Sequence, residues 1–211
     1  NVETVFPQRA REDGRFYARD FTLAELRRLN VHEREDNKQN RVFPTRFAAT
    51  TSRFTIATLY EHFDLISELN RQFGKNIGVY PEVKSPAFHL VEGVDASQIV
   101  IEALQRFNLD GADDNSYLQC FDFNEVKRIR RELGYKGKVV MLIGENDWKE
   151  SSTDYTWIRS AEGMAEVAKY ANGIGPWIPQ LLNQDDTKSK KIEAANWVAH
   201  AHSNNLVIHP Y

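Results

Sequence analysis

Two charged residues, Glu82 and Lys84, offer the clearest chemistry in this sequence. They lie in the stretch I-G-V-Y-P-E-V-K-S-P (77–86), an apolar run that turns polar and stops at a proline, as a buried strand feeding a loop does. Strand side chains alternate between faces, so Glu82 and Lys84 share one face and Val83 takes the other. A buried acid and base are costly unless they pair or bind a ligand. Because α/β proteins build active sites at the carboxyl ends of parallel strands, we predict a ligand site here, with a structural ion pair as the alternative.

Alternating helices and strands are expected to position this pair. Strands are predicted at 77–86, 116–121, 138–144 and 206–211, whereas 173–176 is too short to be identified as a strand. Amphipathic helices are predicted between them, the first capped by Thr55 and ending near Gly74, the later ones near 95–107, 122–133, 161–170 and 192–202. This alternation indicates parallel strands joined by right-handed crossovers. No glycine-rich phosphate loop follows any strand, which disfavours a nucleotide-binding fold and leaves part of a (β/α)8 barrel.

The charge, the apolar runs and the cysteine content of the sequence argue against several classes of protein. The 211 residues carry a net charge of -3 with charges interspersed, so no nucleic-acid partner is expected, and no apolar run is long enough to span a membrane. The single cysteine, Cys120, excludes an internal disulfide and a cysteine-based zinc site.

Residues 1–50 differ from the rest of the chain. They are polar and arginine-rich, and only a capping box at Thr22 and Glu25 marks a short helix. We therefore expect a loop-rich region. Its arginines, and the basic residues of the predicted 122–133 helix, are expected to form solvated faces; they are Arg9, Arg11, Arg27, Arg28, Lys127, Arg128, Arg130 and Arg131.

An ordered set of short motifs resembles the long-form bacterial glycerophosphodiester phosphodiesterases. The motifs are Y-P-E-V-K-S-P (80–86) with His89, Y-L-Q-C-F-D (117–122), N-G-I-G-P (172–176) and V-I-H-P-Y (207–211), with weaker matches near the start, so the likeness covers essentially the whole chain. The resemblance implies a TIM-type (β/α)8 barrel, here strands three to seven plus an insertion after strand two. Residues 1–50 would be that insertion, and 51–211 would belong to the barrel. The implied reaction is metal-dependent hydrolysis of glycerophosphodiesters to glycerol 3-phosphate and an alcohol.

The resemblance also assigns roles to five residues. Glu82 matches a metal-ligand glutamate, and Lys84 matches a lysine that holds the phosphate; a carboxylate suits Ca²⁺ or Mg²⁺, and an ammonium neutralises a phosphodiester oxyanion. Gln119 and Phe121 share a strand face and match pocket-lining positions, and Tyr211 matches an aromatic residue of the pocket wall.

Two nearby residues are given lesser roles. Cys120 should point away from the pocket as a small buried residue. His89 is expected to lie in a loop, where histidines are more often plain polar contacts than catalysts.

The family's catalytic motifs are missing from the sequence. A His-Arg-Gly on strand one, a Glu-x-Asp on strand two and a second histidine after it supply the family's acid–base pair and further metal ligands, and none occurs here. No catalytic residue is therefore assigned. We expect a fragment or truncated product that is inactive alone and is poorly soluble or paired with another copy as a homodimer.

Several alternatives stay open. The chain is either the middle of an active phosphodiesterase or a non-catalytic remnant that binds phosphate esters. A sugar-phosphate isomerase or aldolase using Lys84 as base or Schiff-base amine rests on fold analogy alone. A periplasmic location is implied only by the resemblance, and head-group preference is not indicated.

Overall fold

The computed structural model describes residues 2–36, 38, 40–46, 54–182 and 193–211. The chain divides into two compact units, Asn1–Asp64 and Leu65–Tyr211. The first is built from short helices, and the second carries a parallel sheet.

The first unit has its own small core. Its helices are α1 (Val2–Val5), η1 (Pro7–Arg9), η2 (Ala18–Asp20) and α2 (Leu23–Leu26). The predicted capping box is confirmed, because the Thr22 hydroxyl accepts from the Glu25 amide while the Glu25 carboxylate accepts from the Thr22 amide. Phe6, Phe21 and Leu29 are buried together, so this region is more than a loop excursion.

The expected solvated face of this unit is only partly formed, because Arg27 and Arg28 are exposed whereas Arg9 and Arg11 are half-buried. Arg9 pairs with Glu25 at 2.8 Å, and Arg11 contacts the Asp20 carboxylate through two nitrogens at 2.6 and 2.7 Å. Arg27 pairs with Glu61 at 2.5 Å, and the Arg28 guanidinium lies 4.7 Å from the centre of the Phe6 ring. The prediction was wrong for Arg9 and Arg11, because their acidic partners are distant in sequence and leave no local pattern.

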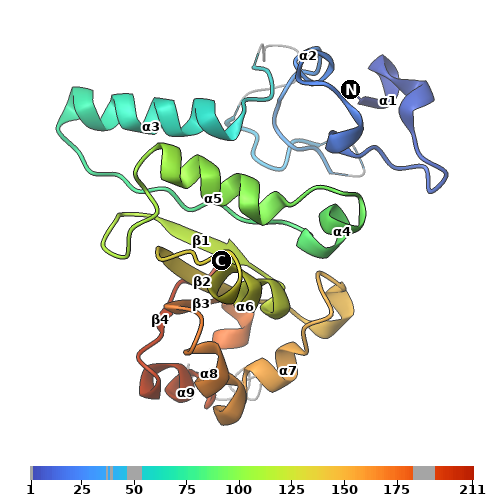
Figure 1. Cartoon of the computed structure of the whole chain (residues 1–211). Helices are drawn as coiled ribbons and strands as arrows, with labels where there is room; N and C mark the ends of the chain where they lie inside the picture. Colours follow the sequence, from blue (N-terminus) through green and yellow to red (C-terminus); the bar gives the residue numbers. More distant parts are fainter. Residues whose placement is uncertain (1, 37, 39, 47–53, 183–192) are drawn as a thin grey trace. The chain divides into compact units, whose positions relative to one another are not determined.

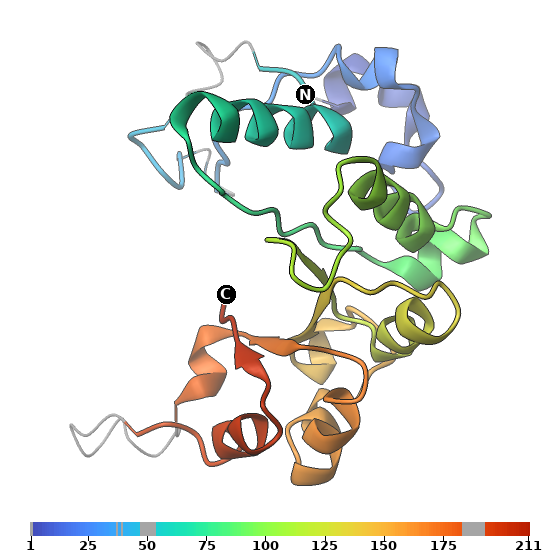
Figure 2. The ribbon, with the colours of Figure 1, turned by 60° about the vertical axis from the view of Figure 1, so that its left-hand side comes forward.

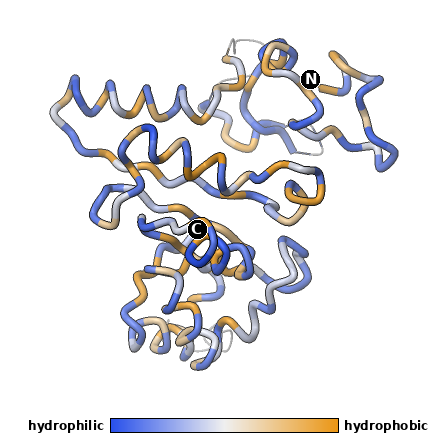
Figure 3. Tube along the Cα trace, viewed as in Figure 1, coloured by the Kyte–Doolittle hydropathy of each residue, from blue (hydrophilic) through white to orange (hydrophobic). Residues whose placement is uncertain are grey.

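Helix α3 (Leu59–Phe73) begins later than predicted. Its start is capped by Thr58, whose hydroxyl accepts from the Glu61 amide, and not by Thr55. Polar and apolar residues alternate along α3 and α5 in Figure 3, as expected of amphipathic helices. Gly74 ends the helix with a positive φ of 60°, a conformation that favours glycine.

Four parallel strands form the sheet of the second unit (Figure 1). They are β1 (Tyr117–Cys120), β2 (Lys138–Ile143), β3 (Gly173–Pro176) and β4 (Val207–Ile208), paired in the order β1-β2-β3-β4. A doubly wound sheet reverses its order partway, whereas a (β/α) barrel adds each strand beside the last. The sequential order is therefore that of a barrel. The four-residue strand β3 is the element that the sequence did not identify.

The predicted strand at 77–86 is only partly regular. It pairs in parallel with β1 at Val79↔Ser116 and Glu82↔Gln119. The Val79 and Val83 amides donate to β1-side carbonyls at 3.1 and 2.9 Å, but the intervening donor position is Pro81, which has no N–H. This missing hydrogen bond explains why the segment forms isolated bridges instead of a continuous strand.

Helices α5 (Ala96–Arg106), α6 (Phe123–Arg131), α8 (Ala161–Val167) and α9 (Val198–Ser203) follow one another around one side of the sheet (Figure 2). The second unit also contains the shorter helices α4 (Pro86–Val91), η3 (Asn146–Trp148), α7 (Tyr155–Ile158) and η4 (Ile178–Leu181). Asp95 and Asp122 cap α5 and α6 through their side chains, as predicted. Helix α4 replaces the loop expected after Lys84.

The basic residues of α6 are only partly solvated, contrary to the expectation. The Arg128 guanidinium contacts Asp95 at 2.7 and 2.9 Å and Glu125 at 2.7 Å. Arg130 donates to three backbone carbonyls, including that of Tyr170 at 2.7 Å. These two arginines fasten α6 to neighbouring segments.

The sheet is strongly curved. Segment 77–83 lies beside β1, four positions from β4, and in a flat sheet with strands about 4.8 Å apart that separation is about 19 Å. Yet the Tyr80 hydroxyl lies 2.9 Å from Nδ1 of His209, and the ring centres of Tyr117 and His209 are 4.9 Å apart. Such closeness requires the strands to curl toward each other, as they do around a barrel.

Candidate active site

Side chains along strand β1 alternate between the two faces of the sheet. Leu118 and Cys120 are fully buried, whereas Tyr117 and Gln119 are half-buried. The burial of Cys120 agrees with the prediction that it points away from the pocket, and it also raises the pKa of the thiol to about 12. Cys120 is therefore a protonated packing residue, and the site faces the other way.

Glu82 and Gln119 lie side by side on that half-buried face, because they are bridge partners on parallel segments. Val83 is 2% exposed and belongs to the core on the opposite face. Gln119 Nε2 donates to the Tyr80 carbonyl at 3.1 Å, which holds the amide in place. Oε1 of Glu82 is buried and has no hydrogen-bond partner among the described residues. A buried carboxylate oxygen without a partner is costly, so this atom is suited to a ligand.

Lys84 is exposed and forms no ion pair within the described part of the chain. The structural Glu82–Lys84 pair that the sequence left open is thus not formed. Directly afterwards Ser85 adopts a left-handed conformation, with φ 47°, and the chain turns into α4. The ammonium is left at the carboxyl end of the strand segment, where a phosphate can approach it.

His89 lies in α4 and not in a loop. It is half-buried, and its ring packs edge-on against Phe88 at 5.2 Å between centres. The structure shows a packing contact for this histidine.

Phe121 and Tyr211 extend the same face at the ends of β1 and β4. Their rings meet edge-to-face at 5.8 Å, and Phe121 makes a second such contact with Tyr155 at 6.3 Å. The Tyr211 hydroxyl donates to the Ile143 carbonyl at 3.1 Å and so joins the chain end to β2. Burial raises the pKa of Tyr211 above its ordinary value, and Tyr155, Glu150, Glu145 and Glu82 raise it further.

Other residues at the strand ends were not predicted. Gln180, which is 8% exposed, donates to the Gly144 carbonyl at 2.9 Å and to Glu145 at 2.7 Å. Its Oε1 accepts from the Trp177 amide at 3.0 Å, and Arg159 holds Glu145 from the other side at 3.1 Å. The available signal was the Trp-x-x-Gln that follows β3, but β3 itself was too short to identify.

The described residues offer one ligand for a divalent metal ion, the carboxylate of Glu82. Among the residues that the structure describes, no group of three or more His, Cys, Asp or Glu side chains is arranged to hold a metal. Glu82, with its unsatisfied oxygen, is the side chain of this face that suits a hard cation, which would take its remaining oxygen ligands from elsewhere.

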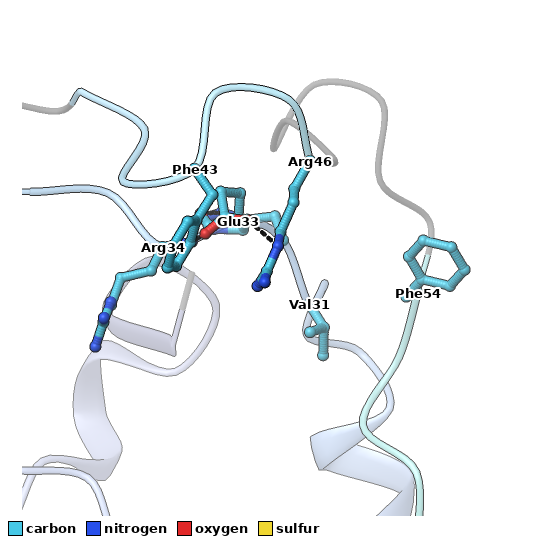
Figure 4. Close-up of a pocket in the computed structure, with 7 residues that line it drawn as sticks. Val31, Glu33, Arg34, Phe43, Arg46 and Phe54 are labelled. Atoms are coloured by element: carbon cyan, nitrogen blue, oxygen red, sulfur yellow. Dashed lines mark hydrogen bonds and ion pairs between the residues drawn. The ribbon is translucent and has the colours of Figure 1, made fainter. Parts of the chain in front are cut away.

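A separate hollow of about 500 Å³ lies within the first unit (Figure 4). Glu33 stands at its centre, 8% exposed, with its carboxylate 4.0 Å from Arg46 and accepting from the Arg34 amide at 3.0 Å. Phe43 and Val31 add apolar walls. None of the predicted site residues lines it.

Relatives of known identity share the whole length of the chain. A protein of Haemophilus influenzae named glycerophosphodiester phosphodiesterase is 38% identical over all of this chain and 63% of its own length. A protein of Treponema pallidum with the same name is 31% identical over 99% of this chain and 64% of its own length. The chain thus spans somewhat under two thirds of the curated relatives that it matches.

Structural comparison points to the same fold. A crystal structure from Silicibacter pomeroyi, described as a candidate glycerophosphoryl diester phosphodiesterase, superposes with a TM-score of 0.60 at 19% identity, over 90% of this chain and 57% of the other. Among the helices described here, none is long and apolar enough to cross a membrane. The profile of the glycerophosphoryl diester phosphodiesterase family matches residues 3–211. The α/β fold is part of a TIM-type barrel, and the chain belongs to the glycerophosphoryl diester phosphodiesterase family.

Proposed function

We propose that the protein containing this chain hydrolyses glycerophosphodiesters to glycerol 3-phosphate and an alcohol, using Ca²⁺ or Mg²⁺. The family membership and the names of the relatives support this reaction. The same match favours a hydrolase over the isomerase or aldolase alternative, which rested on fold analogy alone.

The observation that carries the proposal is the unsatisfied oxygen of Glu82. It lies on the same sheet face as Gln119, and Lys84 follows two residues later. A carboxylate held without a partner is suited to a cation, and a nearby unpaired ammonium is suited to a phosphate. Paired protein charges would instead have satisfied each other.

Each side chain has a distinct role in this proposal. Glu82 holds the divalent ion, which when bound supplies positive charge to the phosphate oxygens. Lys84 neutralises a phosphate oxygen through its ammonium. Gln119, fixed by its bond to the Tyr80 carbonyl, retains its side-chain oxygen for a substrate hydroxyl, while Phe121 and Tyr211 form an apolar wall.

A second candidate is a phosphate-ester binding protein without hydrolysis. One observation favours it: Lys84 is exposed and forms no ion pair within the described part of the chain, so its ammonium can bind a phosphate ester whether or not a metal ion is present.

One substitution separates the two functions. In the full-length protein, Glu82→Gln should reduce glycerol 3-phosphate release from glycerophosphodiesters by about 10²-fold or more and weaken activation by added Ca²⁺ or Mg²⁺. Glu132→Gln, which changes an exposed glutamate after α6, is the matched control and should retain activity. Wild-type activity in the Glu82 variant, or activity that chelators leave unchanged, would refute the metal-ligand role. Binding of glycerophosphodiesters without any turnover in the wild type would support the second candidate.

Periplasmic location and a role in lipid and glycerol metabolism belong to the same proposal, since they are supported only by the resemblance to long-form bacterial members. The homodimer also stays a prediction, to be checked by light scattering.

A further inference from the structure

We propose that His209 is a positioning residue for the candidate active site and acts through its hydrogen bond to the Tyr80 hydroxyl. With Tyr117 these two residues form the ring cluster, a group of three aromatic side chains on the concave face of the sheet. The inference rests on the proposed function, because it concerns how the residues assigned to that site are held in place.

All three rings of the cluster contact one another. The ring centre of Tyr80 lies 5.5 Å from that of Tyr117 and 5.7 Å from that of His209, and the other two centres are 4.9 Å apart. The Tyr80 hydroxyl and Nδ1 of His209 are 2.9 Å apart. Burial raises the pKa of Tyr80, so its hydroxyl keeps the proton needed to donate this hydrogen bond. The cluster thus connects segment 77–83, β1 and the chain that follows β4.

Each ring lies two residues before a residue of the candidate site, on the same segment of chain. The pairs are Tyr80 with Glu82, Tyr117 with Gln119, and His209 with Tyr211. Side chains two apart on a strand share a face and are separated by about 6.6 Å along it. The ring cluster is therefore the layer of side chains directly beneath the site.

The chain after β4 stays extended as far as Tyr211, so the same spacing applies there. The His209 amide donates to the Ile174 carbonyl at 2.9 Å, and the Tyr211 amide donates to the Pro176 carbonyl at 3.1 Å. A step of two residues on both chains is that of a parallel ladder. His209 and Tyr211 thus face the same side of the sheet.

Tyr80 links the ring cluster to the site through its backbone. Its carbonyl oxygen accepts from Gln119 Nε2 at 3.1 Å, while its hydroxyl contacts His209. Between Tyr80 and Glu82 stands Pro81, whose ring fixes its own φ angle and whose carbonyl accepts from the Gln119 amide at 3.0 Å. A displacement of Tyr80 is therefore passed on to both Glu82 and Gln119.

The carboxylate of Glu82 depends on this support. Its Oε1 is buried and has no hydrogen-bond partner among the described residues, so the backbone that carries Glu82 sets the position of this oxygen. On one side that backbone is bonded to β1, where the Val83 amide donates to the Gln119 carbonyl at 2.9 Å. The bond between Tyr80 and His209 adds a contact across the concave face. Because Ca²⁺ takes its oxygen ligands within a narrow range of about 2.3–2.6 Å, a small shift of the segment weakens its binding.

The competing explanation is that the ring cluster only stabilises the fold. It predicts that loss of His209 lowers the free energy of unfolding but leaves turnover by each folded molecule unchanged. A positioning role predicts a fall in kcat as well. It also predicts a smaller change in KM, because the ammonium of Lys84, which holds the phosphate in the proposed function, forms no hydrogen bond or ion pair with the ring cluster.

The test compares variants of the full-length protein. His209→Ala removes the ring, whereas His209→Asn keeps a hydrogen-bonding group near the position of Nδ1. Tyr80→Phe removes the hydroxyl and keeps its ring. His202→Ala, at an exposed histidine of α9, is the matched control. Circular dichroism gives the folded fraction of each variant, by which the rates are corrected.

With a glycerophosphodiester and Ca²⁺, His209→Ala should lower kcat about 10- to 100-fold, as loss of a residue that orients a metal ligand does, and change KM by less than about threefold. His209→Asn should restore most of this loss. Tyr80→Phe should also lower kcat, and combining it with His209→Ala should add little, because both remove the same bond. Calorimetric titration with Ca²⁺ is a readout independent of turnover, and the affinity should fall about tenfold in His209→Ala. His202→Ala should match the wild type in every measurement.

Unchanged kcat and Ca²⁺ affinity in folded His209→Ala, with a loss of stability alone, would overturn the inference. If His209→Ala does not fold, wild-type kcat and Ca²⁺ affinity in Tyr80→Phe would overturn it equally. Hydrolysis by the wild type would leave the proposed function intact in both cases. A wild type that binds Ca²⁺ more tightly than His209→Ala does, yet releases no glycerol 3-phosphate, would refute the proposed function alone.

Discussion

The hydroxyl of Tyr80 and Nδ1 of His209 lie 2.9 Å apart, although 129 residues separate them in the sequence. Their segments occupy opposite edges of the described sheet, so this contact spans the concave side between its first and last strands. Tyr117 completes the cluster with ring contacts to both residues, at 5.5 Å to Tyr80 and 4.9 Å to His209. The cluster therefore helps to maintain the curvature of the sheet.

Replacing Tyr80 with phenylalanine should destabilise the protein by about 1 kcal/mol, the usual net value of one hydrogen bond. Urea unfolding followed by circular dichroism measures the loss. A double-mutant cycle with His209→Ala supplies the control, because the two losses should not add if the bond is real. Strict additivity would show that the contact contributes nothing.

Replacing Arg128 with methionine should cost about 3 kcal/mol of unfolding free energy. Its partner Glu125 has a side chain only 6% exposed, and the substitution leaves that carboxylate buried, with the Ser97 hydroxyl as its remaining side-chain partner among the described residues. Lys136→Met, at an exposed lysine, is the matched control and should change stability by less than about 0.5 kcal/mol. A variant as stable as this control would show that the buried glutamate does not depend on Arg128.

Asp95 should contribute to stability in a pH-dependent way. Hydrogen bonds from Arg128 hold the pKa of Asp95 below its ordinary value of 3.8. A carboxyl group with a lowered pKa in the folded protein stabilises it above the unfolded pKa, and this contribution is lost as the pH falls through the folded pKa. Asp95→Asn should thus cost at most about 1 kcal/mol at neutral pH, since the side chain is 34% exposed, and the difference should vanish in strong acid. Urea unfolding at several pH values checks this, and a constant difference would contradict it.

Gly173 and Gly175 in β3 should respond differently to alanine. A Cβ at Gly173 would lie 2.7 Å from the Val207 carbonyl oxygen, a backbone atom that cannot move without shifting β4. A Cβ at Gly175 meets chiefly the flexible end of Leu142, at 2.6 Å. We expect losses of about 3 kcal/mol for Gly173→Ala and about 1 kcal/mol for Gly175→Ala in urea unfolding. Equal losses would mean that β4 adjusts as easily as a side chain does.

Local patterns in the sequence sufficed for the caps of α2, α5 and α6 and for strands β1 and β2. The i, i+2 alternation at Gln119 and Phe121 corresponds to one face of β1, and Asp95 and Asp122 begin helices where predicted. Such features depend on neighbouring residues, which is why they can be read from sequence.

Features that depend on distant partners could not be predicted. Arg9 and Arg128 were expected in solvent because Glu25 and Asp95, 16 and 33 residues away, were not recognisable as partners. Strand β3 escaped identification because two of its four residues are glycines, which have low strand propensity. For the same reason Trp177 and Gln180 were not predicted as residues of the site, because they lie at the strand ends only once β3 is placed in the sheet.

Because two residues of β3 are glycines without side chains, side chains of the neighbouring strands fill the space beside them. The space beside Gly175 is filled by Leu142 and Val140 of β2, and the space beside Gly173 by Val207 of β4. The total side-chain volume that β2, β3 and β4 can place in this region is therefore fixed. A larger residue in β3 would be accommodated only together with a smaller one in β2 or β4, so among homologues these positions should change as linked pairs.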